Sequence, residues 1–226
     1  MLVAGGTGGL GRAVSVAFLE AGATVVVTHR NQSELEALRH SAGAGAPRLE
    51  GHSVDVTSDV AVQQMIASVI AKHGRLDAVT NAVGGYAAGK KLWETEPKVF
   101  DQMLSLNFYS GYFLIRAVVP VMLKQGQGAI VNVASTAARD HAGSAAAYVA
   151  SKAAAVAMVD SLAADLKGTG VRANSILPSI IDTEANRKAM PDADFAKWPK
   201  PQEIARVILF LCSDDAKLIH GAAIPV

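Results

Sequence analysis

The chain has 226 residues, of which 50% are hydrophobic and 18% are charged, and its formal net charge is +1. This composition excludes a disordered chain, and the length suffices for one α/β domain with a substantial core. The near-zero charge gives no strong field for nucleic acid or an anionic membrane surface. The single cysteine, Cys212, provides neither an internal disulfide nor a metal framework, so we expect no metal and a reducing, cytoplasmic location.

Short apolar runs alternate with longer helical patterns along the chain. The strand candidates are Met1–Ala4, Thr24–Thr28, Leu49–Val54, Ala78–Thr80, Ala129–Ala134, Arg172–Leu177 and a last one near Ala222–Val226. The helical patterns are Gly11–Ala21, Ser33–His40, Asp59–His73, Lys98–Lys124, Ala147–Lys167 and Gln202–Leu211. Continuous apolar strands are typical of strands covered on both faces. The alternation predicts a doubly wound, seven-stranded parallel sheet in three α/β/α layers, as a single domain over residues 1–226.

We expect no membrane-spanning segment. The chain enters a strand-like segment at Met1, so we expect no signal peptide. Its abrupt start, and its end at Val226, lead us to expect that a few residues are missing at each end.

The first strand-to-helix turn is rich in glycine, with Gly5, Thr7, Gly9, Leu10 and Gly11 in the sequence AGGTGGLG. Glycines let a ligand approach the backbone closely, and the free N–H groups at a helix start favour a pyrophosphate. Because the turn follows a strand and opens a helix, it predicts a dinucleotide site rather than a turn without a ligand.

The end of the second strand indicates which dinucleotide is bound. An acid there would hold the ribose hydroxyls of NAD, whereas a base suits the extra phosphate of NADP. The sequence Thr28-His29-Arg30-Asn31 has no acid, and the Arg30 guanidinium suits a phosphate by geometry and charge. His29 and Asn31 are candidates for further hydrogen bonds. We therefore favour NADP(H) over NAD(H); the alternative is that Arg30 is a solvated loop residue.

The strongest catalytic signal is Tyr148 followed four residues later by Lys152, because residues at this spacing share one helix face. A lysine cation one turn away is expected to lower the pKa of the phenol. A phenol tuned in this way can exchange a proton with a carbonyl or alcohol oxygen while a hydride moves.

Two further residues support this interpretation. Ser135 follows a strand at the edge where open α/β sheets bind ligands, and its hydroxyl can orient a substrate oxygen. Asn107 lies inside a long helical pattern, where asparagine is unfavourable, which suggests a buried polar task such as holding a water for proton transfer. The alternatives are a serine that satisfies the loop backbone and an exposed helical asparagine.

Nearly the whole chain resembles the short-chain dehydrogenase/reductase family, which has a Rossmann-type fold. The Gly-rich turn resembles the family's TGxxxGxG, with Ala4 in place of Thr, and the tetrad Asn107, Ser135, Tyr148 and Lys152 matches its catalytic residues. The remaining matches, expected to contact the cofactor, are Asp55-Val56, then Asn81-Ala82-Val83 for NNAG, and Pro178 to Thr183 with Ile181 for PGxIxT. Ala82 replaces an Asn and Ser179 a Gly. In the family, Tyr148 and Lys152 also contact the nicotinamide ribose.

This resemblance implies an NADP(H)-dependent oxidoreductase that acts on a small carbonyl or alcohol substrate, similar to carbonyl reductases that include 3-oxoacyl-carrier-protein reductases. The substrate loop at about 184–200 resembles that of dihydropteridine reductase, so a pterin reductase is an alternative. Phe195, Trp198 and Tyr86 are candidates to stack on a flat ring, although we favour Phe195 and Trp198 as anchors of the loop. His141 is expected to be a solvated loop residue.

A dinucleotide-sensing module without catalysis is the alternative from another class of protein, since fold does not fix function. The intact tetrad speaks against it. The apolar faces of the two long Ala- and Val-rich helical patterns predict a helix-to-helix contact between subunits, and the family resemblance implies a homotetramer or a dimer.

Overall fold

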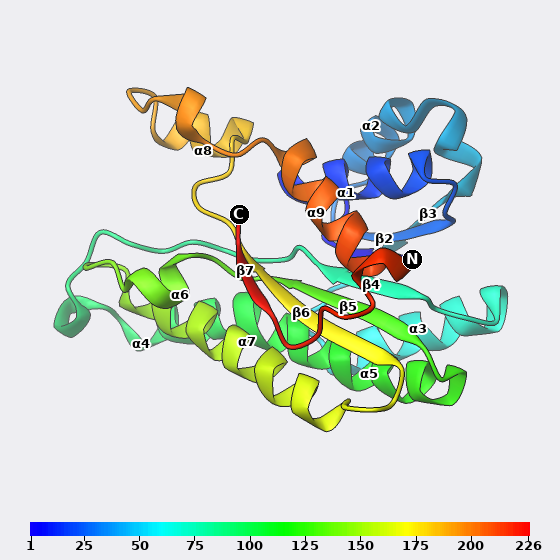
Figure 1. Ribbon diagram of the computed structural model, residues 1–226. Coiled ribbons are helices and arrows are strands. Elements are labelled where there is room, and N and C mark those ends of the chain that lie inside the picture. Colours follow the sequence, from blue (N-terminus) through cyan, green and yellow to red (C-terminus); the bar gives the residue numbers. More distant parts are fainter.

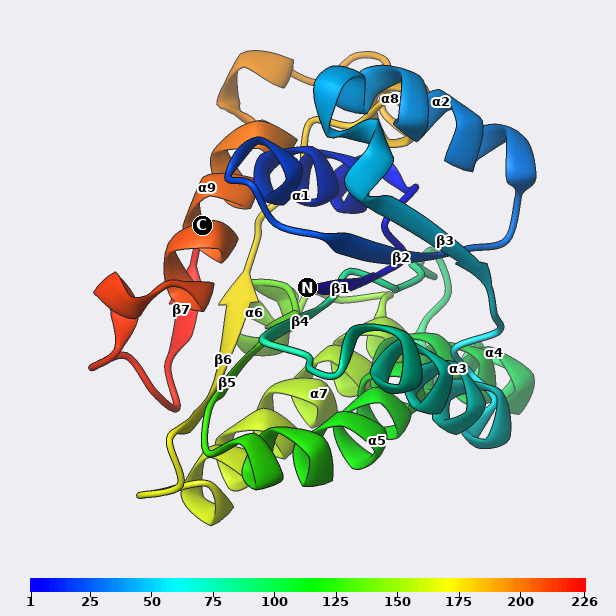
Figure 2. The ribbon, with the colours of Figure 1, turned by 90° about the vertical axis from the view of Figure 1, so that its right-hand side faces the viewer.

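The computed structural model describes residues 1–226 and is built on one parallel sheet of seven strands in the order β3-β2-β1-β4-β5-β6-β7 (Figures 1 and 2). The strands are β1 (Leu2–Ala4), β2 (Val25–His29), β3 (Leu49–Ser53), β4 (Ala78–Asn81), β5 (Gly128–Val133), β6 (Val171–Leu177) and β7 (Ala223–Pro225). All seven predicted strands are confirmed, with no boundary shifted by more than one residue. The strands are added in opposite directions on the two sides of β1, and this arrangement opens a ligand crevice at the carboxyl ends of the strands.

Helices cover both faces of the sheet (Figures 1 and 2). One layer holds α1 (Gly9–Glu20), α2 (Gln32–Ala42) and α9 (Pro201–Cys212), and the other holds α3 (Asp59–His73), α5 (Ser110–Gln125) and α7 (Ala146–Asp165). A core of 18 buried residues lies on each side, as expected for a sheet that is sandwiched between two helical layers. The predicted three-layer fold is therefore confirmed.

The predicted helix over Lys98–Lys124 is continuous but irregular. It consists of α4 (Pro97–Leu104), a π-helical turn (Ser105–Tyr109) and α5. Such turns insert an extra residue, which rotates the side chains that follow and often marks a functional site. The turn contains Asn107.

Shorter helical segments were not predicted from the sequence: a 3₁₀ segment (Gly43–Arg48), α6 (Ala137–Asp140), α8 (Glu184–Ala189) and 3₁₀ turns at Leu92–Glu94, Phe195–Lys197 and Asp214–Ala216. Each of them spans six residues or fewer, too short for a helical period to show in the sequence.

The expectation that no segment has the length and composition of a membrane span is wrong. Two helical stretches, Pro97–Gln125 and Ala146–Asp165, are long and apolar enough to cross a membrane by these two criteria. Both turn one side toward the sheet, where Leu114, Val118 and Met122 on α5 and Ala155 and Val159 on α7 are buried. Their apolar character therefore has an explanation within the folded core.

Candidate active site

The turn from β1 into α1 has the backbone of an anion-binding site. Gly5 has φ +71°, a left-handed conformation that favours glycine, and its N–H donates to Thr28 Oγ1 at 2.8 Å. A Cβ on Gly11 would lie 2.0 Å from the carbonyl oxygen of Gly5, so a larger residue would push the turn away from the helix. Gly8, the N-cap of α1, provides no side-chain cap, and the first N–H groups of α1 are thus left for a ligand.

The adenosine end of this turn brings together the residues predicted at the end of β2. His29 is 7% exposed, and its Nδ1 has no hydrogen-bond partner within the protein. Arg30 is exposed and close enough to Asp55 to help lower the pKa of that carboxyl, after the larger effect of hydrogen bonds from Thr57. Asn31 caps α2, because its Oδ1 accepts from the N–H of Ser33 at 2.9 Å. A buried, unpaired imidazole nitrogen beside an exposed guanidinium fits a polar group such as a ribose phosphate.

Sequence reasoning missed a carboxylate at the same end. Thr7 Oγ1 donates to Glu34 Oε2 at 2.9 Å, so an acid from the first turn of α2 reaches the Gly-rich turn. An acid was expected only at the end of β2, whereas Glu34 lies in the first turn of α2. Glu34 adds a negative charge to a region in which Arg30 is the predicted phosphate ligand.

The segment after β4 lies against the turn on the other side. Asn81 is 5% exposed; it donates to Asn132 Oδ1 at 3.1 Å and accepts from the N–H of Val83 at 3.2 Å. A Cβ on Gly5 would lie 3.1 Å from Val83 Cγ2, which sets the closeness of the two segments. Ala82 donates its N–H to the carbonyl of Ala4 at 3.0 Å, so the strand contact persists with alanine in place of asparagine.

Asn107 is buried, as predicted, and its amide is fully engaged. Its Oδ1 accepts from the N–H of Gly85 at 2.9 Å, and its Nδ2 donates to Gly85 O at 3.1 Å and to Ser151 Oγ at 3.0 Å. Ser151 Oγ in turn donates to the carbonyl of Tyr148 at 2.7 Å. These bonds connect the π-helical turn directly to the first turns of α7. The side-chain amide therefore binds groups of the protein, and its expected role in holding a water for proton transfer stays a prediction.

Tyr148, Lys152 and Ser135 converge at the carboxyl edge of β5. Ser135 lies two residues beyond the end of β5, and its hydroxyl is close enough to the phenol of Tyr148 to act on the pKa of that group. Lys152 is 5% exposed, and its Nζ donates to the carbonyl of Val133, the last residue of β5, at 3.0 Å. A Cβ on Gly84 would lie 2.9 Å from Asn107 Oδ1 and 3.2 Å from Lys152 Nζ, so these two tetrad residues also lie close together at Gly84.

The pKa of Tyr148 is raised, whereas a lowered pKa was expected. Burial raises the pKa of Tyr148, the contact with Ser135 acts in the opposite direction, and Lys152 is not among the causes of the shift. Burial lowers the pKa of Lys152 to about 8. The Lys152 ammonium is directed to Val133 O in this structure, so an effect of its charge on the pKa of Tyr148 stays a prediction. The phenol remains protonated at neutral pH and is ready to donate.

The segment after β6 reaches the start of α1. Pro178 O accepts from the N–H of Thr136 at 3.0 Å, and Ile181 O accepts from Asn186 Nδ2 at 2.8 Å. Thr183 caps α8, and a Cβ on Gly9 would lie 2.8 Å from Thr183 Cγ2. Thr183 therefore lies directly over the first residue of α1, where the anion-binding N–H groups are.

The substrate side contains Tyr86, which is 72% exposed and meets the Tyr148 ring edge-on at 4.9 Å between centroids. Phe195 and Trp198 instead pack on each other at 4.9 Å, and Trp198 is only 9% exposed. The interpretation of these two as anchors of the loop agrees with this packing. His141 is exposed.

Comparison with known proteins gives consistent matches over the full chain. A family model described as enoyl-(acyl carrier protein) reductase matches residues 4–226. The D-threitol dehydrogenase of Mycolicibacterium smegmatis is 35% identical over 98% of this chain and 88% of its own length. The 3-oxoacyl-[acyl-carrier-protein] reductase of Thermotoga maritima is 28% identical over 100% and 94% of the two chains.

Two solved structures have the same fold. The structure titled ElxO with NADP bound has a TM-score of 0.94 and 26% identity, over 100% of this chain and 95% of that one. NAD⁺-bound xylitol dehydrogenase has a TM-score of 0.91 and 26% identity, over 100% and 96% of the two chains. The first of these structures contains NADP and the second contains NAD⁺.

The fold and these similarities define an NAD(P)-dependent oxidoreductase that acts on alcohol and carbonyl groups. Its Gly-rich turn and the residues at the carboxyl ends of the strands fit such a dinucleotide. The chain belongs to the short-chain dehydrogenase/reductase family.

Proposed function

We propose that this protein is an NADP(H)-dependent carbonyl reductase in which Tyr148 donates the proton to the carbonyl oxygen. The observation that carries the proposal is the convergence of a protonated, half-buried phenol with Ser135 and a buried Lys152 ammonium at the ligand-binding edge of the sheet. A phenol of raised pKa holds its proton at neutral pH, and the proton is then available to an oxygen that gains negative charge.

Each residue of the tetrad has a distinct role in this proposal. The Ser135 hydroxyl orients the substrate oxygen and donates to it as charge develops. Lys152 holds the nicotinamide ribose and, after Tyr148 has given up its proton, stabilises the phenolate by its charge. Asn107 fixes the distance between the 85–86 segment and α7 through Gly85 and Ser151. Bound NADPH supplies the hydride.

The preference for NADP(H) rests on the adenosine end of the site. Arg30 would face the 2′-phosphate, and the unpaired His29 Nδ1 would gain a partner there. The neighbouring Glu34 opposes a phosphate, so we expect this preference to be moderate rather than absolute. Gly5, Thr7, Gly9, Leu10 and Gly11 would hold the pyrophosphate, and Asp55 and Val56 the adenine.

A 3-oxoacyl thioester is the first substrate to test, because a relative that is named for this activity aligns over the whole chain. The assay follows NADPH oxidation with this substrate and a panel of simple ketones. Tyr148→Phe should lower kcat by about 10³-fold or more, while NADPH affinity changes little. Tyr112→Phe, at a 41% exposed position on α5, is a control for the same substitution. Turnover by Tyr148→Phe at the wild-type rate would contradict the proposal.

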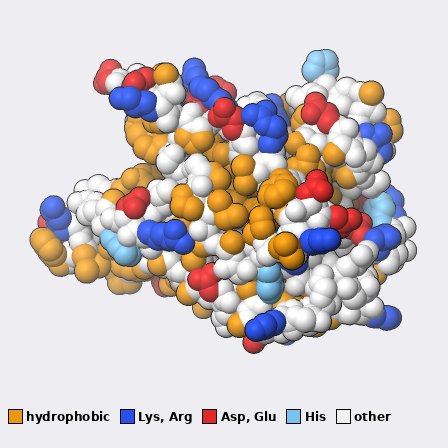
Figure 3. Space-filling model, viewed as in Figure 1, with side chains coloured by type: hydrophobic (Ala, Val, Ile, Leu, Met, Phe, Trp, Pro, Cys, Tyr) orange, Lys and Arg blue, Asp and Glu red, His pale blue; other side chains and the backbone are white.

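A homo-oligomer, tetramer or dimer, and a cytoplasmic location remain proposals. Hydrophobic side chains gather at the centre of the face that carries the edge strand β7 (Figure 3). Phe210 on α9 and Leu218, five residues before β7, are 43% and 91% exposed. Exposed apolar patches of this kind favour association. Sedimentation velocity tests the oligomer, and cell fractionation tests the location.

A further inference from the structure

The segment 184–200, called the lid below, leaves the body after β6 and returns at α9 (Figure 1). It includes α8 and the 3₁₀ turn Phe195–Lys197, and neither contains a buried residue. Trp198 is the one buried apolar side chain of the lid. Segments with so few buried contacts have low local stability, so polar contacts have a large share in fixing their position.

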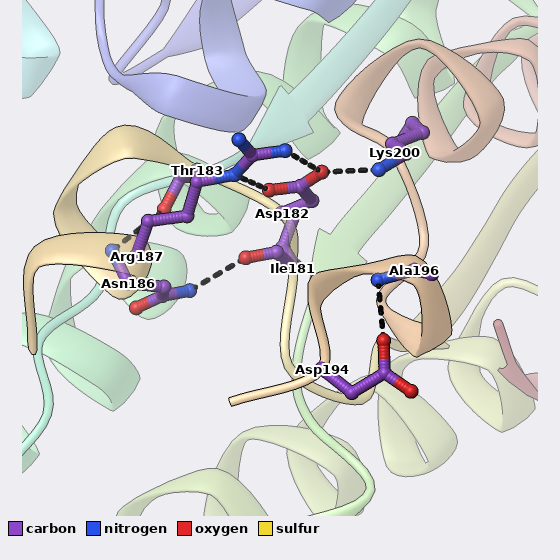
Figure 4. A network of polar contacts seen from close by, with 8 residues as sticks. All are labelled: Ile181, Asp182, Thr183, Asn186, Arg187, Asp194, Ala196 and Lys200. Atoms are coloured by element: carbon purple, nitrogen blue, oxygen red, sulfur yellow. Dashed lines mark hydrogen bonds and ion pairs between the residues drawn. The ribbon is translucent and has the colours of Figure 1, made fainter. Parts of the chain in front are cut away.

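One carboxylate joins the two ends of the lid. Asp182 precedes the lid, and its side chain is 4% exposed. Arg187 donates from Nε to Asp182 Oδ1 at 2.5 Å and from an amino group to Oδ2 at 2.8 Å, while Lys200 Nζ also contacts Oδ2 (Figure 4). Bidentate arginine contacts fix orientation as well as distance. Arg187 belongs to α8 and Lys200 immediately precedes α9.

The contact to Arg187 extends further into the lid. The Arg187 guanidinium lies over the Phe195 ring, 4.8 Å from its centroid, and Phe195 packs on Trp198. The backbone N–H of Asp182 also donates to the carbonyl of Pro199 at 3.0 Å. Both side-chain and backbone contacts of Asp182 thus hold the segment that leads into the lid next to the segment that leaves it.

The same carboxylate is adjacent to the cofactor-binding turn. Thr183, the next residue, lies against Gly9 at the start of α1, where a Cβ would be 2.8 Å from Thr183 Cγ2. A shift of Asp182 therefore moves Thr183 relative to the anion-binding N–H groups.

We propose that Asp182 is a positioning residue that fixes the lid over the site through Arg187 and Lys200, and that couples the lid to dinucleotide affinity through Thr183. The expected effect on substrate binding rests on the proposed function. The expected effects on the lid position and on dinucleotide affinity do not. The hydrogen bonds from Arg187 and Lys200 keep the pKa of Asp182 well below its usual range. The carboxylate is therefore charged throughout the neutral range, and its contacts with Arg187 and Lys200 should not change with pH there.

The test compares Asp182→Asn with Glu184→Gln. Both variants remove one carboxylate charge without changing side-chain size, but Glu184 is 82% exposed and pairs only with the equally solvated Lys188. Limited trypsin digestion without nucleotide reports lid opening, because Arg187, Lys188 and Lys197 lie within the lid. We expect Asp182→Asn to be cut there about tenfold faster than wild type, and Glu184→Gln within about twofold.

Binding and kinetics provide the second readout. NADPH fluorescence should give a Kd about five- to tenfold higher for Asp182→Asn, and KM should rise more than kcat falls. In Arg187→Gln, much of the effect of Asp182→Asn should already be present, so the double variant should be less than additive. A melting temperature near that of wild type shows that the fold persists.

The outcomes separate the two proposals. If trypsin cleavage and NADPH affinity of Asp182→Asn match those of Glu184→Gln, the positioning role is wrong, whatever the wild type catalyses. If Asp182→Asn is cut faster by trypsin and binds NADPH more weakly, but the wild type reduces no carbonyl compound with NADPH, the positioning role stands and the proposed function is wrong.

Discussion

Replacement of Lys152 by methionine should stabilise the protein while it destroys activity. Burial lowers the pKa of this lysine from 10.5 to about 8, which means that the folded state disfavours the ammonium. A difference of about 2.5 pKa units corresponds to about 3 kcal/mol of unfolding free energy at neutral pH. Methionine has a similar length and carries no charge, so it removes this cost but leaves Val133 O without its donor, which costs about 1 kcal/mol. The net expected gain is about 2 kcal/mol at pH 7.

The pH dependence distinguishes this cause from better packing. Between the folded pKa of about 8 and the unfolded value of 10.5, the unfolded chain binds more protons than the folded one. Wild-type stability should therefore rise with pH in this window relative to the variant, and the charge cost should shrink to about 1.5 kcal/mol at pH 9.5. The net advantage of the variant should then be close to zero.

The assay is urea unfolding followed by circular dichroism at pH 7 and pH 9.5. Lys167→Met, at an exposed position just after α7, is the matched control and should change stability by less than about 0.5 kcal/mol at either pH. A Lys152→Met variant that is less stable than wild type at pH 7, or whose stability difference does not depend on pH, would refute the reasoning.

Three more predictions concern the dinucleotide site. Gly11→Ala places a Cβ 2.0 Å from the carbonyl oxygen of Gly5; it should cost about 3 kcal/mol in urea unfolding and abolish NADPH binding, whereas Gly143→Ala, which has open space around it, should do neither. Arg30→Ala should raise the Kd for NADPH about tenfold and leave that for NADH nearly unchanged. Glu34→Gln should act in the opposite direction and lower the Kd for NADPH about threefold, because it removes a carboxylate beside the 2′-phosphate position. Isothermal titration of both nucleotides checks these values, and equal shifts for NADPH and NADH would contradict the assignment of Arg30 and Glu34.

The sheet was predictable because its strands are continuous apolar runs at regular spacing. Buried parallel strands and long helices leave strong periodic signals, so both layers and the order of elements followed from the sequence. Short segments such as α6 and α8 left no such signal. The π-helical turn was also not predicted, although the unfavourable Asn107 inside a helical pattern pointed to its position.

The convergence of the candidate residues Ser135, Tyr148 and Lys152 was predictable because Ser135 follows a strand and the other two share a helix face. The sequence did not reveal which group each of these side chains contacts through a hydrogen bond. The spacing of Tyr148 and Lys152 predicts neighbours but does not reveal that Val133 O takes the ammonium. Glu34 and Asp182 were missed for a related reason, since their partners Thr7 and Lys200 are 27 and 18 residues away.

We propose that this chain moves a hydride to a carbonyl carbon with Tyr148 as the proton donor. The most direct test uses NADPH that carries deuterium at the transferred position, and mass spectrometry of the alcohol product. The account predicts one deuterium at the carbinol carbon with wild type and almost no labelled product with Tyr148→Phe under the same conditions. Product without the label, or equal labelling by Tyr148→Phe, would contradict it.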